Sequence, residues 1–239
     1  IKSSLKTAIK EGLIESVSLD FIYPKTNIKD KIYTLSKQNQ DKLTNYILKN
    51  QSIKSLGILL TLYSGIRIGE LCALQWKDID FKNNILHINK TLQRVYIKDT
   101  QVNTSKVIIT NPKTHNAERE IPLNKEFAYE LKKYKTNASD YILSCNSKWI
   151  EPRTYRRFFE KISKRAKIEK INFHGLRHTF ATNCIKLGVD YKTVSELLGH
   201  ATVNITLNLY VHPQMDQKKK CINLVCKNFQ KKFSNNSNF

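Results

Sequence analysis

Apolar residues recur every three to four positions along most of this chain, which is the period of a helix with one face against a core. The clearest case is the segment 53–63, in which five side chains keep that spacing: Ile53, Leu56, Leu59, Leu60 and Tyr63. We interpret this segment as a core helix. The same period predicts further helices over residues 4–13, 37–50, 68–74, 125–134, 151–166, 175–187, 192–198 and 204–210.

Two of these helices also show which side faces the core. The helix over 151–166 is expected to bury four side chains, Tyr155, Phe158, Phe159 and Ile162. Its other sides carry six cations, Arg153, Arg156, Arg157, Lys161, Lys164 and Arg165. The helix over 175–187, ended by Gly188, is expected to point four side chains inward, Leu176, Phe180, Cys184 and Leu187.

The pattern changes after Trp76 to an alternation of apolar and polar residues, which is the period of a β-strand. This alternation predicts strands over 85–88, 91–97, 106–109 and 119–123, with a turn signal at Asn111-Pro112. We expect about three of these strands to form one small antiparallel sheet, with Lys113 at the tip of its last hairpin. The fold class is therefore predicted as mainly α with a small antiparallel sheet, an α+β fold.

These patterns divide the chain into three regions. Residues 1–30 are interpreted as the last helix of a domain cut off upstream, followed by a linker whose boundary lies near 24–31, because a lone helix cannot bury its apolar face. Residues 31–215 are expected to form the main domain. Residues 216–239 form a tail that carries six lysines and no acidic residue after Asp216.

Charge and composition narrow the class of partner. The chain has 41 lysine and arginine residues against 20 aspartate and glutamate residues, a formal net charge of +21. This excess favours a polyanion, and nucleic acid first, because lysine and arginine contacts to phosphate dominate such binding; a basic bias of the whole proteome is the alternative. No segment approaches the roughly 20 apolar residues that cross a membrane. The five scattered cysteines are expected to be reduced thiols in a cytoplasmic protein.

Candidate chemistry gathers between His174 and Tyr210. The block His174-Gly175-Leu176-Arg177-His178 places an arginine between two histidines, and Leu198-Gly199-His200 follows before the tyrosine. Arginine binds phosphate oxygens bidentately, and a tyrosine beside such a phosphate can act as its nucleophile. This stretch therefore predicts a site at which a tyrosine attacks a bound phosphate.

A second arginine, Arg67, stands at the predicted start of a helix, where backbone N–H groups favour an anion. Glu70 follows three residues later and could orient its guanidinium. The structural interpretation of Arg67, a salt-bridged surface residue, stays open at this point.

The pair His174 and His178 also resembles half of a zinc site, so a metal hydrolase is the competing interpretation. No glutamate of the H-E-x-x-H kind lies between them, Arg177 would place a cation beside the metal, and no cysteine or aspartate has ligand spacing nearby. We therefore predict no metal. His178 is interpreted as a structural histidine of the helix or core.

Five short blocks together resemble the tyrosine recombinases, the phage-type integrases of mobile elements such as conjugative transposons and prophages. In the order and spacing of that family they are Gly65-Ile66-Arg67-Ile68-Gly69-Glu70-Leu71, Pro112-Lys113-Thr114, His174-Gly175-Leu176-Arg177-His178-Thr179, Leu198-Gly199-His200, and Tyr210. The resemblance covers roughly residues 35–213. It implies the catalytic-domain fold of the family for 31–215 and a remnant of a helical core-binding domain in 1–30. For the tail, 216–239, it implies exchange between protomers, and a merely solvated tail is the open alternative.

The resemblance implies six catalytic positions, all of them filled here: Arg67, Lys113, His174, Arg177, His200 and Tyr210. The tyrosine would attack the scissile phosphodiester, form a 3′-phosphotyrosyl bond and release a 5′-hydroxyl. The arginines would hold the phosphate, and the lysine would protonate the leaving oxygen. The first histidine would accept the tyrosine proton, and the second would hydrogen-bond the phosphate. No cofactor is implied.

The function implied is that of a site-specific recombinase, or integrase, that inserts and excises a mobile element in the bacterial cytoplasm. The implied partners are double-stranded DNA, further copies of the chain on DNA (dimer to tetramer) and an accessory protein for excision, with no membrane. Four cations of the 151–166 helix are predicted to contact DNA, Arg153, Arg156, Arg157 and Lys161. Two alternatives stay open: a type IB topoisomerase-like enzyme, and a non-catalytic DNA-binding regulator.

Overall fold

The computed structural model describes residues 2–15, 33–98, 103–111, 117–210, 219 and 222–227 of the chain. It consists of two units, Ile1–Lys31 and Ile32–Phe239. The described part of the first unit contains the helix α1 (Lys2–Lys10), which ends before Gly12 takes up a left-handed conformation. The helix predicted over 4–13 is therefore present but ends earlier. The predicted boundary near 24–31 lies outside the described residues.

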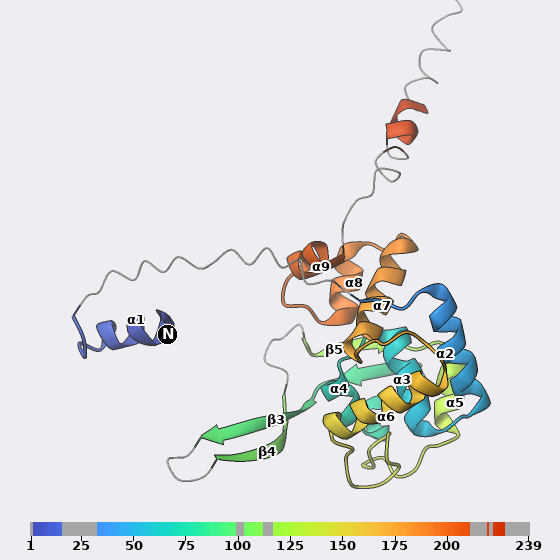
Figure 1. The fold of residues 1–239 in the computed structure, drawn as a ribbon, viewed down its shortest axis with the longest axis horizontal. Coiled ribbons are helices and arrows are strands. Elements are labelled where there is room, and N and C mark those ends of the chain that lie inside the picture. Colours follow the sequence, from blue (N-terminus) through green and yellow to red (C-terminus); the bar gives the residue numbers. More distant parts are fainter. Residues whose placement is uncertain are drawn as a thin grey trace, which may run out of the picture. The chain divides into compact units, whose positions relative to one another are not determined.

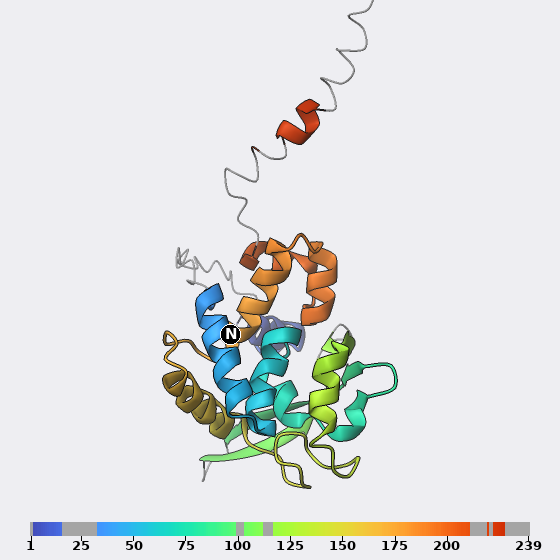
Figure 2. The same ribbon diagram turned by 90° about the vertical axis from the view of Figure 1, so that its right-hand side faces the viewer.

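The second unit begins with three helices, α2 (Lys37–Lys49), α3 (Ile53–Ser64) and α4 (Ile68–Ala73). Ser36 caps the start of α2, while Ser52 and Ser55 form a reciprocal capping box at the start of α3. Almost every side chain of α3 is buried, so α3 is the core helix that its apolar spacing predicts. In Figures 1 and 2 it runs through the middle of the unit.

The turn between α3 and α4 depends on a glycine. Gly65 has a φ of +69°, a left-handed conformation that only glycine adopts at little cost. A Cβ at this position would lie 2.5 Å from Cδ1 of Phe180 and 2.8 Å from Cδ2 of Leu198. The close packing of α7 and α8 against this turn therefore also requires a residue without a side chain.

The strands form two small sheets instead of the single sheet predicted. In the first, β2 (Ile85–Ile88) lies between β1 (Ile79–Asp80), which follows a short 3-10 helix at Trp76–Asp78, and β5 (Arg119–Pro122). In the second, β3 (Thr91–Lys98) pairs with β4 (Asn103–Thr110), in register from Thr91↔Thr110 to Lys98↔Asn103. Both sheets are antiparallel. Because β2 already has a partner on each side, it offers β3 no free edge, and β3 and β4 extend from the helices as a separate hairpin (Figure 1).

The remaining helices are α5 (Lys125–Lys132), α6 (Pro152–Arg165), α7 (His174–Lys186), α8 (Tyr191–Leu198) and α9 (Val203–Tyr210). Helices α7 to α9 lie together at one end of the unit (Figures 1 and 2). Leu187 was predicted to pack inward, but its side chain is 83% exposed. It follows the last residue of α7 as the cap, where the backbone turns away and the helical period no longer applies. The predicted fold class, mainly α with small antiparallel sheets, is confirmed.

Two apolar clusters hold this unit together. The large one contains the buried faces of α3, α4, α6 and the first sheet, and it includes Leu176 near the start of α7. The small one has Ala181, Val194 and Leu198 at its centre, with Phe180 and Tyr210 packed against it. The helix α7 belongs to both clusters, because Leu176 lies in the large one and Ala181 in the small one. It contacts α3, α8 and α9. Within the described residues, no helix is both long and apolar enough to cross a membrane.

Candidate active site

Arg67 lies at the junction of α3 and α4, and its guanidinium is oriented by Glu70. Its Nη1 donates to Oε1 of Glu70 at 2.8 Å, and its backbone N–H donates to Oε2 at the same distance. Its Nη2 donates to the carbonyl oxygen of Gly199 at 3.0 Å, which links it to the end of α8. The orienting contact predicted for Glu70 is present.

Glu70 has a second cationic partner that the sequence did not reveal. Arg119, at the start of β5, donates from Nη2 to Oε2 at 2.9 Å and from Nη1 to Oε1 at 3.1 Å. Burial alone would raise the pKa of Glu70, but the hydrogen bonds and charges of Arg119 and Arg67 outweigh it and keep the pKa below its ordinary value. The carboxylate is therefore ionised and holds both guanidinium groups.

Arg177 on α7 is almost completely buried, with 2% of the residue exposed. Its Nη1 donates to the carbonyl oxygen of Gly65 at 2.8 Å. Burial and the neighbouring charge of Arg67 lower the pKa of Arg177 to about 9, so it remains a cation at neutral pH. Arg67 thus contacts Glu70 on α4, and Arg177 contacts Gly65 in the α3–α4 turn. The two arginines meet at this junction although more than a hundred residues separate them in the sequence.

His174 and His200 are neutral imidazoles at physiological pH. Burial, together with the cations around the two rings, lowers the pKa of His174 to about 4 and that of His200 to about 3. The Nδ1 of His200 is 2.8 Å from Oγ1 of Thr206, a completely buried residue one helical turn before Tyr210. Both rings can therefore hydrogen-bond an anion without carrying a charge of their own.

The hydroxyl of Tyr210, at the end of α9, contacts a histidine that was predicted to be structural. Its oxygen is 2.6 Å from Nδ1 of His178. The ring of His178 in turn meets the ring of His174 edge to face, with centroids 4.6 Å apart. The spacing of four residues between the two histidines was the available signal, because it places both rings on one side of a helix.

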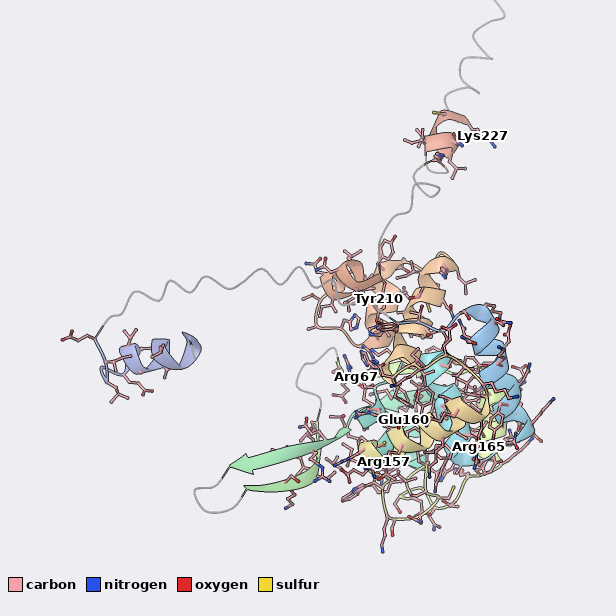
Figure 3. The ribbon with its side chains drawn as sticks, viewed as in Figure 1. Arg67, Arg157, Glu160, Arg165, Tyr210 and Lys227 are labelled. Atoms are coloured by element: carbon pink, nitrogen blue, oxygen red, sulfur yellow. The ribbon has the colours of Figure 1, made fainter. Side chains whose placement is uncertain are left out.

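One pocket brings most of the predicted residues together. It has a volume of about 580 Å³, and five of the predicted catalytic residues line it: Arg67, His174, Arg177, His200 and Tyr210. Figure 3 shows Arg67 and Tyr210 with their side chains. The β3–β4 hairpin contributes Thr91, Gln93 and Thr110 to the lining of the pocket. Lys113 lies outside the described residues, between β4 and β5.

The cations predicted to contact DNA lie elsewhere. Arg153, Arg156, Arg157 and Lys161 are exposed on α6, and none of them lines the pocket. Figure 3 shows Arg157 and Arg165 on this helix, together with Glu160. The opposite face of α6 buries Tyr155, Phe159 and Ile162, as its apolar spacing predicts. Among the described residues, no group of three or more His, Cys, Asp or Glu side chains could hold a metal ion.

The fold and the pocket together define a class of protein: a mainly helical domain in which two arginines and a tyrosine line one pocket. The sequence profile of the phage integrase family matches residues 29–217. The chain belongs to this family, and the predicted resemblance to tyrosine recombinases is confirmed.

Relatives with curated names agree with this assignment. The chain is 32% identical to a tyrosine recombinase XerC-like protein of Caldanaerobacter subterraneus subsp. tengcongensis over 83% of its own length and 55% of the relative's. It is 26% identical to the transposase from transposon Tn916 of Enterococcus faecalis, over 90% of its own length and 57% of the relative's. The chain therefore spans about half the length of these relatives.

Solved structures share the fold. The integrase of transposon Tn1549, in complex with transposon right-end DNA, matches 94% of this chain and 76% of its own with a TM-score of 0.72 at 24% identity. The XerA recombinase matches 93% of this chain and 73% of its own with a TM-score of 0.58 at 22% identity.

Proposed function

We propose that this protein is a site-specific DNA recombinase that cleaves and rejoins DNA through a 3′-phosphotyrosyl intermediate, for the integration and excision of a mobile element. The observation that carries the proposal is that the hydroxyl-bearing side chain of Tyr210 and the guanidinium groups of Arg67 and Arg177 line the same pocket. Relatives named as transposases and the DNA complex of the Tn1549 integrase support the choice of DNA as substrate.

In the proposed reaction, Arg67 and Arg177 hold the non-bridging oxygens of the scissile phosphate and stabilise the charge that develops on them. The Tyr210 oxygen forms a bond to phosphorus, and the bond from phosphorus to the 5′-oxygen breaks with its electron pair. Lys113 supplies a proton to that oxygen, as the family resemblance implies. Because the phosphotyrosyl ester keeps the energy of the broken bond, a new 5′-hydroxyl can reverse the step without ATP.

The histidines of the pocket have proposed roles in the same step. His200 hydrogen-bonds the phosphate, and its contact with Thr206 fixes the orientation of its ring. The family resemblance assigns the acceptance of the tyrosine proton to His174, which lines the pocket beside Arg177.

DNA contacts outside the pocket are proposed for α6. Six exposed cations lie on the side of the helix opposite Tyr155 and Phe159, with one exposed acidic residue, Glu160, among them. They form a predominantly basic surface (the α6 surface: Arg153, Arg156, Arg157, Lys161, Lys164 and Arg165). Such a surface binds the phosphate backbone of a duplex without reading its sequence. We propose that it holds double-stranded DNA while the pocket engages one phosphate.

The assembly proposed on DNA is a homo-oligomer, from dimer to tetramer, with an accessory protein for excision. This proposal is supported by the exposed apolar side chains of a short helical segment in the tail, Ile222, Leu224 and Val225. An apolar segment of this kind gains free energy when a neighbouring copy covers it. We propose that the tail, 216–239, makes this contact in trans.

The deciding experiment replaces the nucleophile. Tyr210→Phe is expected to bind DNA like the unmodified protein but to form covalent adducts at least about 10³-fold more slowly, because the attacking oxygen is gone. The measurement uses a nicked suicide duplex taken from the ends of the element and separates adducts on a denaturing gel. Tyr191→Phe, an exposed tyrosine on α8, is the matched control and is expected to behave normally.

Three outcomes separate the alternatives. An adduct that survives in Tyr210→Phe contradicts the assignment of the nucleophile. The absence of any adduct with the unmodified protein favours a non-catalytic DNA-binding regulator. Adducts accompanied by relaxation of supercoiled DNA, but never by joints between two different duplexes, favour the topoisomerase-like enzyme.

A further inference from the structure

The Tyr210 hydroxyl and the imidazole of His178 are within hydrogen-bond distance of each other. The two atoms, Oη and Nδ1, are 2.6 Å apart, and the rings have centroids 5.5 Å apart. His178 lies one helical turn beyond His174 on α7, so the two histidines present their rings on the same side of one helix. Tyr210 therefore meets the second histidine of the pair.

The two histidines face different surroundings. His174 lines the pocket with Arg67, Arg177 and His200, whereas His178 is half-buried and is not among the pocket-lining residues. A phosphate bound between the arginines would engage the rings that line the pocket. The Nδ1 of His178 instead lies 2.6 Å from the tyrosine hydroxyl.

The protonation states suit a transfer from tyrosine to histidine. Burial, and then the charge of Arg177, lower the pKa of His178, so the ring is neutral at physiological pH. Burial raises the pKa of the Tyr210 hydroxyl, although the charges of Arg177 and Arg67 oppose this, so the phenol keeps its proton. A neutral imidazole with its ring proton on Nε2 can accept the phenolic O–H at Nδ1.

We propose that His178 accepts the phenolic proton of Tyr210 through Nδ1 when the tyrosine attacks the phosphate, and is therefore a catalytic residue. This inference rests on the proposed function and deepens it, and it replaces His174 by His178 as the residue that accepts the tyrosine proton. In the cleavage step, the Oη–phosphorus bond forms, the bond to the 5′-oxygen breaks, and the phenolic proton moves to His178 while the leaving oxygen takes a proton from the acid at position 113. In rejoining, His178 returns its proton to Oη.

The same neighbours that lower the pKa of His178 suit the second half of this cycle. Burial, and then the charge of Arg177, destabilise an imidazolium at this position, so it gives its proton back to the tyrosine when the ester is attacked. During cleavage the negative phosphate between Arg67 and Arg177 offsets that repulsion. His174 is left as a hydrogen-bond partner of the phosphate, like His200.

The test compares three histidine-to-asparagine variants in single-turnover cleavage of the nicked suicide duplex between pH 5.5 and 9. Asparagine places an amide oxygen near the position of Nδ1, so it keeps a hydrogen-bond acceptor for Tyr210 but cannot hold the proton. His178→Asn is expected to lower the rate at pH 7 by about 10²–10⁴-fold. Its rate should then rise about tenfold per pH unit, because hydroxide replaces the lost base.

The other variants show whether the effect is specific. His174→Asn is expected to weaken phosphate binding while the pH profile keeps its original shape. His87→Asn, on β2 and away from the pocket, is the matched control and should cleave within about twofold of the unmodified protein. Added imidazole is expected to restore part of the activity of His178→Ala but none of the activity lost in His174→Ala. This rescue identifies a missing base, which a purely structural role would not produce.

Two results would overturn the inference. One is a His178→Asn rate within about threefold of the original, or above it, since the hydrogen bond would then only restrain the tyrosine. The other is a pH–rate profile that loses the titration of its base in His174→Asn and keeps it in His178→Asn. If His178→Asn does not fold, His178→Gln and the imidazole rescue of His178→Ala decide the question by the same criteria. The proposed function fails separately, when the unmodified protein forms no adduct through Tyr210.

Discussion

Arg119 and Glu70 form a nearly enclosed ion pair at the back of the pocket. Each side chain is 6% exposed, and Arg119 also donates from Nε to the carbonyl oxygen of Leu197 at 2.7 Å. Arg119 therefore connects β5 with α4 and with the last turn of α8. Glu70 also orients Arg67, which lines the pocket. Arg119 therefore supports Arg67 through Glu70, although Arg119 itself does not line the pocket and is not expected to contact the substrate.

The main effect of replacing Arg119 is expected to be on the free energy of unfolding, because Arg119 does not itself line the pocket. Arg119→Met should lower the free energy of unfolding by about 3 kcal/mol, because it leaves the buried Glu70 with one cationic partner fewer and strands the Leu197 carbonyl. Arg94→Met is the matched control. Arg94 pairs with Glu151 at the surface, with side chains 35% and 28% exposed, and its loss should cost at most about 1 kcal/mol. Urea unfolding of both variants measures the difference, and equal losses would contradict the argument.

At the scale of elements, one face of α6 packs in the core and the opposite face is exposed to solvent. Tyr155 is completely buried and donates from its hydroxyl to the carbonyl oxygen of Lys54 at 2.7 Å, which fixes the helix against α3. The α6 surface points the other way. A rigid helix that is anchored in this manner presents its cations in a fixed array, which suits a duplex backbone better than a flexible loop would.

The contribution of the α6 surface can be read from the salt dependence of binding. Replacing Lys161 and Lys164 together by alanine is expected to weaken DNA binding at all sequences and to make the plot of log affinity against log salt less steep by about 2. Lys42 and Lys49, exposed on α2, provide a matched double variant. Titrations of labelled duplex at several salt concentrations measure both slopes. An unchanged slope for the α6 variant would remove this surface from the DNA contact.

The sequence predicted the helices better than the contacts between them. Apolar spacing located α3 and α6, because these helices bury one face or most of their faces against the large cluster, and it located α7, which packs against both clusters. It could not show that β2 is flanked on both sides by β1 and β5, since strand partners are chosen across long separations. The role of Leu187 was predicted wrongly for a local reason, because helical spacing carries no information past the cap.

The sequence predicted those residues of the candidate site that belong to the five motifs. Arg67, Arg177, His174, His200 and Tyr210 line one pocket, while Lys113 remains a prediction outside the described residues. Arg119 was missed because its partner lies 49 residues away. One signal was available: Arg119 shares a strand face with Ile121, a buried residue two positions later, and a cation on an inward face needs a partner.

At the scale of the molecule, the proposed site lies across two packing clusters of unequal size. Arg67 follows directly on α3 and the large cluster, whereas the ring of Tyr210 packs against the small cluster around Val194 and Leu198. Local openings of a fold occur first where few apolar contacts are buried. We therefore expect Tyr210, the proposed nucleophile, to lie on the less stable part of the unit and Arg67 on the more stable part.

Hydrogen exchange should show this inequality directly. Backbone amides of α8 and α9 are expected to exchange at least about tenfold faster than those of the middle of α3, which corresponds to an opening free energy lower by about 1.4 kcal/mol. Exchange followed by mass spectrometry in the absence of DNA measures both sets. Equal protection of the three helices would mean that the unit opens only as a whole.

The glycine turn between α3 and α4 suggests one way in which inherited gene copies of this family can lose activity while they keep their motif residues. The carbonyl oxygen of Gly65 accepts the hydrogen bond of Arg177, and its backbone conformation admits only glycine without strain. A copy that acquires alanine at this position keeps all six motif residues, yet it displaces the α7 and α8 side chains that close over the turn. Surveys that judge inherited copies intact from the six motif residues alone would therefore overcount the working ones, and position 65 belongs among the positions they inspect.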